Sequence, residues 1–168
     1  MKQILETERT YLREFSPDDA KAVLALSGNP QVTRYTGDAD MVKTLEDAEG
    51  VIRTIWLREY KEYGHGRWAV VDKSSSVVIG FCGFKYIPQV QMPDIGYRFL
   101  PEYWGKGLAS ETALACIHFA DVNLHIPKYF ADVMPDNHAS VRVIEKLGMK
   151  FSKNIEEDGE TFRRFTNF

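Results

Sequence analysis

A glycine-rich turn between an apolar strand and a helix is the segment of this sequence best suited to chemistry. It follows the strand-like stretch 94–100, contains Gly105 and Gly107, and leads into a helical pattern that begins at Leu108. Glycines let successive backbone N–H groups converge on an anion, and the first turn of a helix adds unpaired N–H groups and a positive dipole end. The segment predicts a pyrophosphate site, although a tight connection that binds nothing could carry the same glycines.

Three phosphate-binding motifs compete for this turn. A P-loop needs Gly-x4-Gly-Lys-[Ser/Thr], but Leu100 occupies the place of its first glycine and Gly107 follows Lys106. The dinucleotide motif Gly-x-Gly-x-x-Gly is broken at Ser110, and too little chain follows for the second half of such a fold. A third motif, [Gln/Arg]-x-x-Gly-x-[Gly/Ala], fits Gly107 and Ala109.

Hydrophobic periodicity and turn residues place eleven elements around this turn. The strand-helix-strand unit that contains the turn requires a parallel crossover, whereas the earlier strands pair locally and antiparallel. We therefore expect an α/β (α+β) domain, with a mixed sheet and helices on both faces. The expected strands are 11–15, 67–72, 77–86, 94–100, 128–133, 151–157 and 161–166, and the expected helices are 17–27, 44–63, 108–120 and 138–147. The helix 108–120 is apolar nearly all round, which predicts burial over most of its circumference.

Composition narrows the class of protein. The chain has 168 residues and a net charge of -3, which fits one domain over residues 1–168 and gives no basic footprint for nucleic acid. Cys82 and Cys116 lack the spacing of a zinc or disulfide framework and are expected as small buried residues. The first ten residues contain Glu6 and Glu8, and no window reaches the roughly 18 apolar residues of a membrane span. We expect a cytoplasmic protein without a membrane partner.

Four segments together resemble the GCN5-related N-acetyltransferase (GNAT) superfamily, and above all its RimJ/RimL-like ribosomal-protein N-acetyltransferase branch. They are the opening Thr7–Arg13, the strand Asp94–Tyr97, the turn Trp104–Glu111 and the C-terminal Asn137–Gly148. The resemblance covers nearly the whole chain. One departure is Trp104, which stands where the general motif has Gln or Arg.

The resemblance implies a GNAT fold, a mixed and mostly antiparallel sheet of about seven strands flanked by about four helices. It also implies an enzyme that uses acetyl-CoA, moving the acetyl group from the thioester to a primary amine by direct attack in a ternary complex. The acceptor would be a protein N-terminus or a small-molecule amine, and a homodimer stays open. The alternative is a non-catalytic acetyl-CoA-binding sensor or scaffold of the same fold.

By the same resemblance, the cofactor contacts fall into three groups. The backbone of the glycine turn would bind the CoA pyrophosphate, the end of the strand would pair with the pantetheine amides, and the start of the last helix would contact the pantetheine arm. These groups are Gly105, Lys106, Gly107, Leu108, Ala109 and Ser110; Phe99 and Leu100; and Asn137 and Ser140. Asn137 also suits a helix cap, and both roles can hold.

Acyl transfer to an amine needs a base, an oxyanion donor and a proton for the leaving thiolate. Asp94 and Glu111 are the acids nearest the motif, and Asp94 is the preferred base. The family's oxyanion donor corresponds to the N–H of Phe99, and Ser140 would supply or relay the proton. Ile144 occupies the position where many superfamily members carry a tyrosine general acid, so that mechanism is missing here.

The four histidines do not form a metal site in sequence. His118 and His125 could share one helix face, but no third ligand has suitable spacing, so we expect surface histidines and no metal. His65 lies between Gly64 and Gly66, and we expect it in a mobile segment near the substrate cleft.

Overall fold

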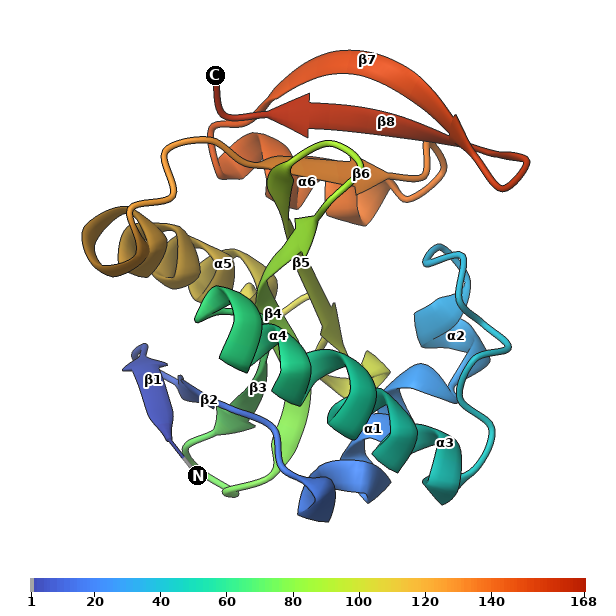
Figure 1. The fold of residues 1–168 in the computed structure, drawn as a ribbon, viewed down its shortest axis with the longest axis vertical. Coiled ribbons are helices and arrows are strands. Elements are labelled where there is room, and N and C mark those ends of the chain that lie inside the picture. Colours follow the sequence, from blue (N-terminus) through green and yellow to red (C-terminus); the bar gives the residue numbers. More distant parts are fainter. Residues whose placement is uncertain (1) are drawn as a thin grey trace.

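The structure, a computed structural model, describes residues 2–168 as one eight-stranded sheet with helices on both faces (Figure 1). The sheet order is β1-β2-β3-β4-β5-β6-β8-β7. The strands are β1 (Gln3–Glu6), β2 (Thr10–Arg13), β3 (Arg67–Asp72), β4 (Val78–Ile87), β5 (Met92–Phe99), β6 (Phe130–Val133), β7 (Lys150–Glu157) and β8 (Glu160–Thr166). The expected mixed α/β architecture is confirmed.

The contact between β5 and β6 divides the sheet into two parts. Every other neighbouring pair is antiparallel, whereas β5 and β6 are parallel and share the single residue pair Asp94–Phe130. The two strands then separate toward the C-terminal end of β5, as Figure 1 shows. The crossover between them runs through α5 (Leu108–Phe119) and the π-helical segment η4 (Ala120–Leu124).

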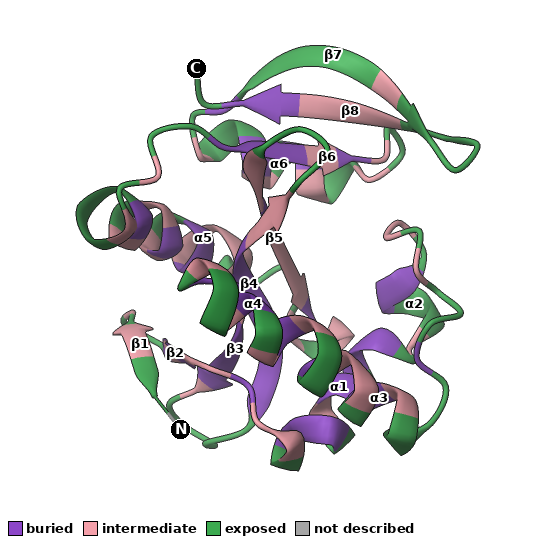
Figure 2. Ribbon diagram, in the orientation of Figure 1, coloured by how far each residue is buried: buried purple, intermediate pink, exposed green. Residues whose placement is uncertain are grey.

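Two apolar clusters hold the helices against the two faces of the sheet (Figure 2). The first lies under α5 and α6 (His138–Lys146) and includes the fully buried Trp68 and Phe84. The second packs α1 (Ala20–Ser27), α3 (Leu45–Val51) and the π-helical segment η2 (Ile52–Trp56) on the other face. The last helix on this face is α4 (Leu57–Tyr63), which extends η2.

Local signals explain where the long helix of residues 45–63 begins and ends. Thr44 caps α3 by accepting the N–H of Asp47 at 3.1 Å, and the carboxylate of Asp47 accepts the N–H of Thr44 at 2.9 Å. At the other end Gly64 adopts φ +74°, a left-handed conformation that favours glycine.

Three features differ from the expectations. β1 is an eighth strand that was not predicted. It has only four residues, and they are too exposed to show a clear apolar-polar alternation in the sequence. A further short helix, α2 (Pro30–Thr33), follows α1 directly, because Asn29 caps it by accepting the N–H of Gln31. The expected burial of α5 on nearly all sides is wrong: Leu114 is half exposed, and one face of the helix packs on the sheet.

Short 3-10 turns complete the connections. They are η1 (Pro17–Asp19), which precedes α1, and η3 (Pro101–Tyr103), which links β5 to the glycine turn. The predicted hairpin at Asp158–Gly159 is confirmed, since it joins β7 to β8 with Glu157 opposite Glu160.

Candidate functional site

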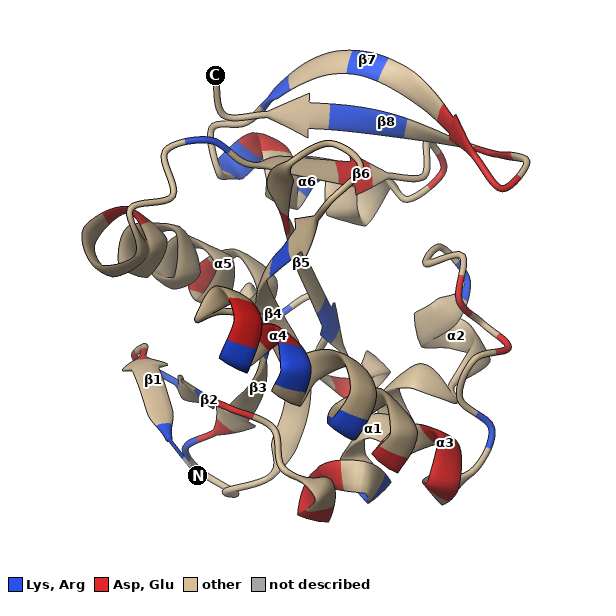
Figure 3. Ribbon diagram, viewed as in Figure 1, with Lys and Arg blue, Asp and Glu red and all other residues tan. Residues whose placement is uncertain are grey.

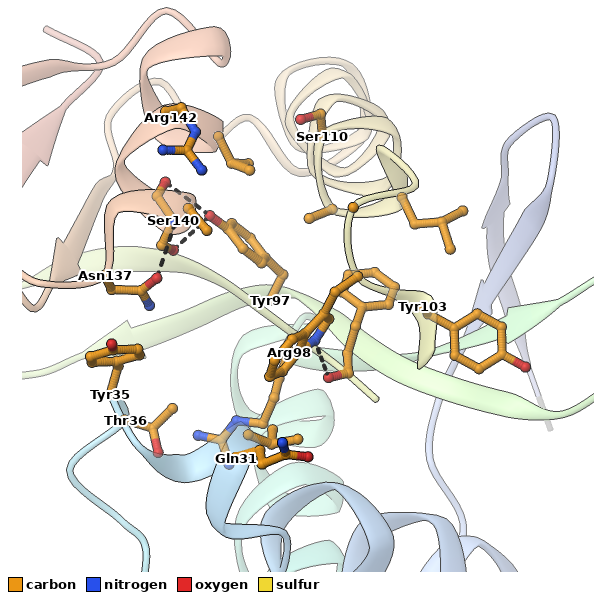
Figure 4. A pocket seen from close by; sticks show the side chains of 18 of the residues that line it. Gln31, Tyr35, Thr36, Tyr97, Arg98, Tyr103, Ser110, Asn137, Ser140 and Arg142 are labelled. Carbon is orange, nitrogen blue, oxygen red and sulfur yellow. Dashed lines mark hydrogen bonds between the residues drawn. The ribbon is translucent and has the colours of Figure 1, made fainter. Parts of the chain in front are cut away.

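Two cavities open on either side of the C-terminal half of β5. The first has a volume of about 700 Å³ and lies between the glycine turn, the start of α5 and the start of α6. The second, of about 920 Å³, is lined from β4, β5, β6, the segment after α2 and the β7–β8 hairpin. Six residues line both cavities, so their shared wall is where two ligands could meet: Tyr35, Thr36, Tyr97, Arg98, Asn137 and Ser140 (Figure 4).

The glycine turn forms one wall of the first cavity. Gly105 and Gly107 have φ values of +71° and +77°, so the turn needs residues that tolerate the left-handed region. Gly107 is the N-cap of α5, and the N–H groups of Leu108, Ala109 and Ser110 belong to the first helical turn, where no intrahelical carbonyl is available. Gly105, Gly107, Leu108, Ala109 and Ser110 all line the cavity, which makes it suitable for an anion.

Arg9 holds this turn from outside the cavity. Its Nη1 donates to the carbonyl of Lys106 at 2.8 Å, and its Nε donates to Glu111 at 2.7 Å. The backbone N–H of Arg9 also donates to Glu111 at 3.1 Å. These contacts connect the start of β2 to both ends of the turn, and sequence reasoning did not assign them.

The end of β5 presents one backbone edge to the opening between β5 and β6. Leu100 lies opposite Ile79 and donates its N–H to that residue's carbonyl at 3.0 Å. Since bonded and non-bonded pairs alternate in an antiparallel ladder, the N–H of Phe99 points away from β4. The carbonyl of Phe99 accepts the indole N–H of Trp104 at 2.8 Å.

This arrangement separates the two residues that were expected to pair with pantetheine. Leu100 has partners for both backbone groups, because its carbonyl accepts the N–H of Tyr103 at 2.9 Å. Because its N–H already donates to Ile79, Leu100 has no free N–H for the expected pairing with pantetheine. Leu100 also lines neither cavity. Phe99 lines the first cavity, and its N–H points away from β4, the direction needed for pairing with pantetheine.

The start of α6 brings Asn137 and Ser140 to the shared wall, where they meet Tyr97 from β5 (Figure 4). Asn137 caps the helix by accepting the N–H of Ser140 at 3.2 Å, so the expected capping role is confirmed. The Tyr97 hydroxyl lies 2.8 Å from the Ser140 hydroxyl and 3.3 Å from the Ser140 carbonyl oxygen. Burial raises the pKa of Tyr97, which keeps this phenol protonated at neutral pH. Sequence reasoning placed Tyr97 in the β5 motif but gave it no chemical role.

Three aspartates that line the second cavity are paired with arginines. Asp94 accepts a hydrogen bond from Arg67, Asp38 lies 3.0 Å from Arg98, and Asp132 lies 2.6 Å from Arg164. Burial raises the pKa of the Asp94 carboxyl, and the positive charge of Arg67 opposes that shift. Asp94 lines the second cavity and not the first.

Several other sequence-predicted residues lie outside the two cavities. Lys106 places its ammonium 5.2 Å from the centre of the Tyr103 ring, and Glu111 pairs with Arg9. The expectation for His65 is wrong: its ring is buried, its Nδ1 lies 3.1 Å from the Phe84 carbonyl, and it lines neither cavity. Ile144, by contrast, is a buried residue of α6, one turn after Ser140, and it lines the second cavity.

Residues 2–168 contain neither a cluster of metal-ligating side chains nor a helix that could span a membrane. No three His, Cys, Asp or Glu side chains gather into a group able to hold a metal ion. None of the helices in this range combines the length and the apolar character needed to cross a bilayer. Cys82 and Cys116 are both buried and free, as expected.

Comparisons with known proteins agree with this geometry. Residues 9–150 match the family model of the acetyltransferase (GNAT) domain. The uncharacterized N-acetyltransferase YoaA of Bacillus subtilis (strain 168) is 34% identical over 151 residues, which cover 89% of this chain and 84% of YoaA. The uncharacterized protein YkkB of the same organism is 34% identical over 164 residues, covering 93% and 90%.

Solved structures share the whole fold. A GNAT-family acetyltransferase from Bacillus anthracis has a TM-score of 0.79 at 26% identity, covering 98% of this chain and 96% of the other. RimL, a ribosomal L7/L12 alpha-N-protein acetyltransferase solved with coenzyme A, has a TM-score of 0.84 at 16% identity, covering 98% and 97%. The chain therefore belongs to the GNAT acetyltransferase family and is an N-acetyltransferase. Members of this family use acetyl-CoA.

Proposed function

We propose that this enzyme transfers an acetyl group from acetyl-CoA to a primary amine by direct attack, with the cofactor in the first cavity and the acceptor in the second. The observation that carries the proposal is the shared wall formed by Tyr97, Asn137 and Ser140. A thioester seated there would be open to an amine from the other side. No covalent enzyme intermediate is needed in such a ternary complex.

The residues present fit CoA. The N–H groups of the glycine turn and of the first turn of α5 would hold the pyrophosphate, since the bulk charge of -3 gives no general attraction for it. The side-chain amide N–H groups of Asn137 would be donors for the pantetheine arm, because its oxygen is already occupied by the helix cap. When bound, acetyl-CoA supplies the activated acyl group.

The N–H of Phe99 is the proposed donor for the oxyanion that forms when the amine attacks the thioester carbonyl. It points into the opening between β5 and β6, on the side where the first cavity lies. A backbone donor held by a strand costs no reorganisation during the reaction.

Asp94 is the proposed base, and it would act through a water relay because it lies five residues before Phe99 on the same strand. An alkylamine with a pKa of about 10 is mostly protonated at neutral pH and must lose a proton before or during attack. Asp94 lines the acceptor cavity, and burial raises its pKa toward the range in which a carboxylate can take a proton. Glu156 and Glu157 line the same cavity at the acidic tip of the β7–β8 hairpin (Figure 3) and would attract the cationic form of the amine.

Ser140 is the proposed proton donor to the leaving thiolate. The carbon–sulfur bond breaks, its electron pair goes to sulfur, and sulfur takes the proton from the Ser140 hydroxyl. Ser140 regains a proton from the ammonium of the tetrahedral intermediate. The cationic amine thus loses two protons, one to Asp94 before attack and one, through Ser140, to sulfur. The acceptor class that fits this mechanism is a primary amine, whether a protein N-terminus or a small molecule.

The test is an acceptor screen with acetyl-CoA, in which peptides and small-molecule amines are offered side by side. CoA thiol release gives the rate, and mass spectrometry of the products identifies the acetylated nitrogen. Turnover with at least one primary amine is expected. Tight acetyl-CoA binding without turnover on any amine would contradict the proposal and favour a non-catalytic acetyl-CoA-binding protein.

A further inference from the structure

The hydroxyl groups of Tyr97 and Ser140 form a side-chain hydrogen bond between β5 and α6. Tyr97 extends from the middle of β5 and packs against the core beneath α5 and α6, whereas Ser140 lies in the first turn of α6 (Figure 4). The two oxygen atoms are 2.8 Å apart, a normal distance for a hydrogen bond between hydroxyl groups. The only other hydrogen-bond partner of the Tyr97 hydroxyl among residues 2–168 is the Ser140 carbonyl oxygen, at 3.3 Å.

One phenolic hydrogen must choose between these two acceptors. If it points to the Ser140 carbonyl, the Ser140 hydroxyl donates to Tyr97 and its hydrogen is used. If it points to the Ser140 hydroxyl oxygen, the Ser140 hydrogen is free to turn into the first cavity. The 2.8 Å distance between the two hydroxyl oxygens fits donation in either direction. A negative charge growing on a sulfur in the cavity would favour the second arrangement, because it would attract the Ser140 hydrogen.

We propose that Tyr97 is a positioning residue for acyl transfer, which donates its hydrogen bond to Ser140 and thereby directs the Ser140 hydroxyl at the thioester sulfur. This inference rests on the proposed function. It gives the β5 strand a second task, because the strand that presents the Phe99 N–H also sets the orientation of the proton donor.

Tyr97 keeps its own proton in this scheme. Burial raises its pKa, so loss of the phenolic proton to Ser140 would leave a costly buried phenolate. The proton that reaches sulfur comes from Ser140 and is replaced from the ammonium, as described above. Tyr97 contributes a hydrogen bond that strengthens as Ser140 becomes more negative.

The position of Ile144 explains why a phenol from β5 is needed. The residue one turn after Ser140 on α6 is Ile144, a buried side chain with 1% exposure, so α6 offers no phenol at this place. The Tyr97 hydroxyl reaches Ser140 from the opposite element. A phenol is therefore present at the shared wall even though α6 does not supply it.

A double-mutant cycle tests this inference. Ser140→Ala should lower kcat by about a hundredfold, the usual scale for loss of a general acid. Tyr97→Phe should lower kcat by about tenfold, with the dissociation constant of acetyl-CoA unchanged within about twofold. The double variant should be no slower than Ser140→Ala, because Tyr97 acts only through Ser140. Equal loss from Tyr97→Phe in both backgrounds, or no loss in the wild-type background, would overturn the inference.

A matched control separates this role from the general loss of a buried phenol. Tyr129 is also buried, with a pKa raised by burial, and it lines neither cavity. Tyr129→Phe should leave kcat unchanged. If the wild type acetylates no amine, the proposed function fails, whereas an active wild type with an unaffected Tyr97→Phe variant contradicts only the inference.

A spectroscopic measurement tests the hydrogen bond without depending on enzyme activity. The Tyr97 resonance in protein labelled at the tyrosine ζ-carbon is assigned by its loss in Tyr97→Phe, or in Tyr97→Leu if that variant folds better. Ser140→Ala should shift this resonance, because it removes the partner at 2.8 Å. Addition of CoA thiol to the wild type should shift it as well. An unmoved resonance in both experiments would refute the hydrogen bond in solution.

Discussion

Ser110→Glu isolates the electrostatic part of acetyl-CoA binding. Ser110 lies in the first turn of α5 and lines the first cavity, where the pyrophosphate is expected. At about 6 Å and an effective dielectric constant of about 20 to 80, two like unit charges repel by about 0.7 to 2.8 kcal/mol. Each phosphate charge at that distance should therefore weaken binding by about threefold to a hundredfold.

The same substitution should not weaken the fold. A carboxylate in the first turn of a helix is favourable by about 0.3 to 1 kcal/mol, because it faces the positive end of the dipole. The melting temperature of Ser110→Glu should therefore equal or exceed that of the wild type. Lower affinity in a protein of unchanged stability would point to the ligand site alone.

The assay is calorimetry with acetyl-CoA, using Ser110→Gln as the control of nearly equal size without charge. The difference between the two variants should shrink in high salt, since the Debye length falls from about 10 Å at 0.1 M to about 3 Å at 1 M. Equal affinity of the Glu and Gln variants at low salt would refute the placement of the pyrophosphate at this helix start.

Three further predictions concern buried charge and the walls of the cavities. Among residues 2–168, one carboxylate oxygen of the buried Glu59 has no hydrogen-bond partner, and burial raises the pKa of this carboxyl. The wild type should therefore lose stability as the pH rises from the pKa of Glu59 in the unfolded chain through its pKa in the folded protein. Glu59→Gln should therefore add about 1 kcal/mol to the free energy of unfolding at pH 7, and this gain should fade toward pH 4. The control Glu62→Gln, at an exposed position, should change the free energy of unfolding little. Urea denaturation at both pH values measures these differences. Arg9→Ala removes the contacts that hold the glycine turn and should weaken acetyl-CoA binding by about three- to tenfold, with calorimetry as the check and unchanged affinity as the contrary result. Asp38→Asn weakens the pair with Arg98 beside the second cavity and should raise KM for the amine more than KM for acetyl-CoA; an equal rise in both would contradict the assignment of the two cavities.

Much of the fold could be predicted from local signals. The strand Arg67–Asp72 has the predicted bounds, and α5 begins at Leu108 as expected. Signals of this kind are local, because they depend on residues three or four positions apart. The same locality explains an omission: the first helix ends at residue 27 as predicted, but Asn29 also begins the short helix α2, which was not predicted.

The site was predictable only in part. The glycine turn has a recognisable sequence, but its support by Arg9 joins residues 102 positions apart. The contact between Tyr97 and Ser140 spans 43 positions, and it exists because β5 and β6 diverge while α6 crosses the opening. No periodicity or motif spacing reports such a contact, since it depends on the three-dimensional path of the chain between the two residues.

The single β5–β6 residue pair has a consequence for folding cooperativity. Backbone hydrogen bonds hold β6, β7 and β8 together, but within the sheet formed by residues 2–168 only the Asp94–Phe130 residue pair joins this group to the remaining five strands. Amide hydrogen exchange should therefore show that β6, β7 and β8 unfold locally as one cooperative unit, and that they exchange faster than β3 and β4. A ligand that bridges the opening adds about 2.7 kcal/mol at a concentration a hundredfold above its Kd. Bound acetyl-CoA should thus stabilise the contact between the two parts of the sheet and slow amide hydrogen exchange in the C-terminal third of the chain.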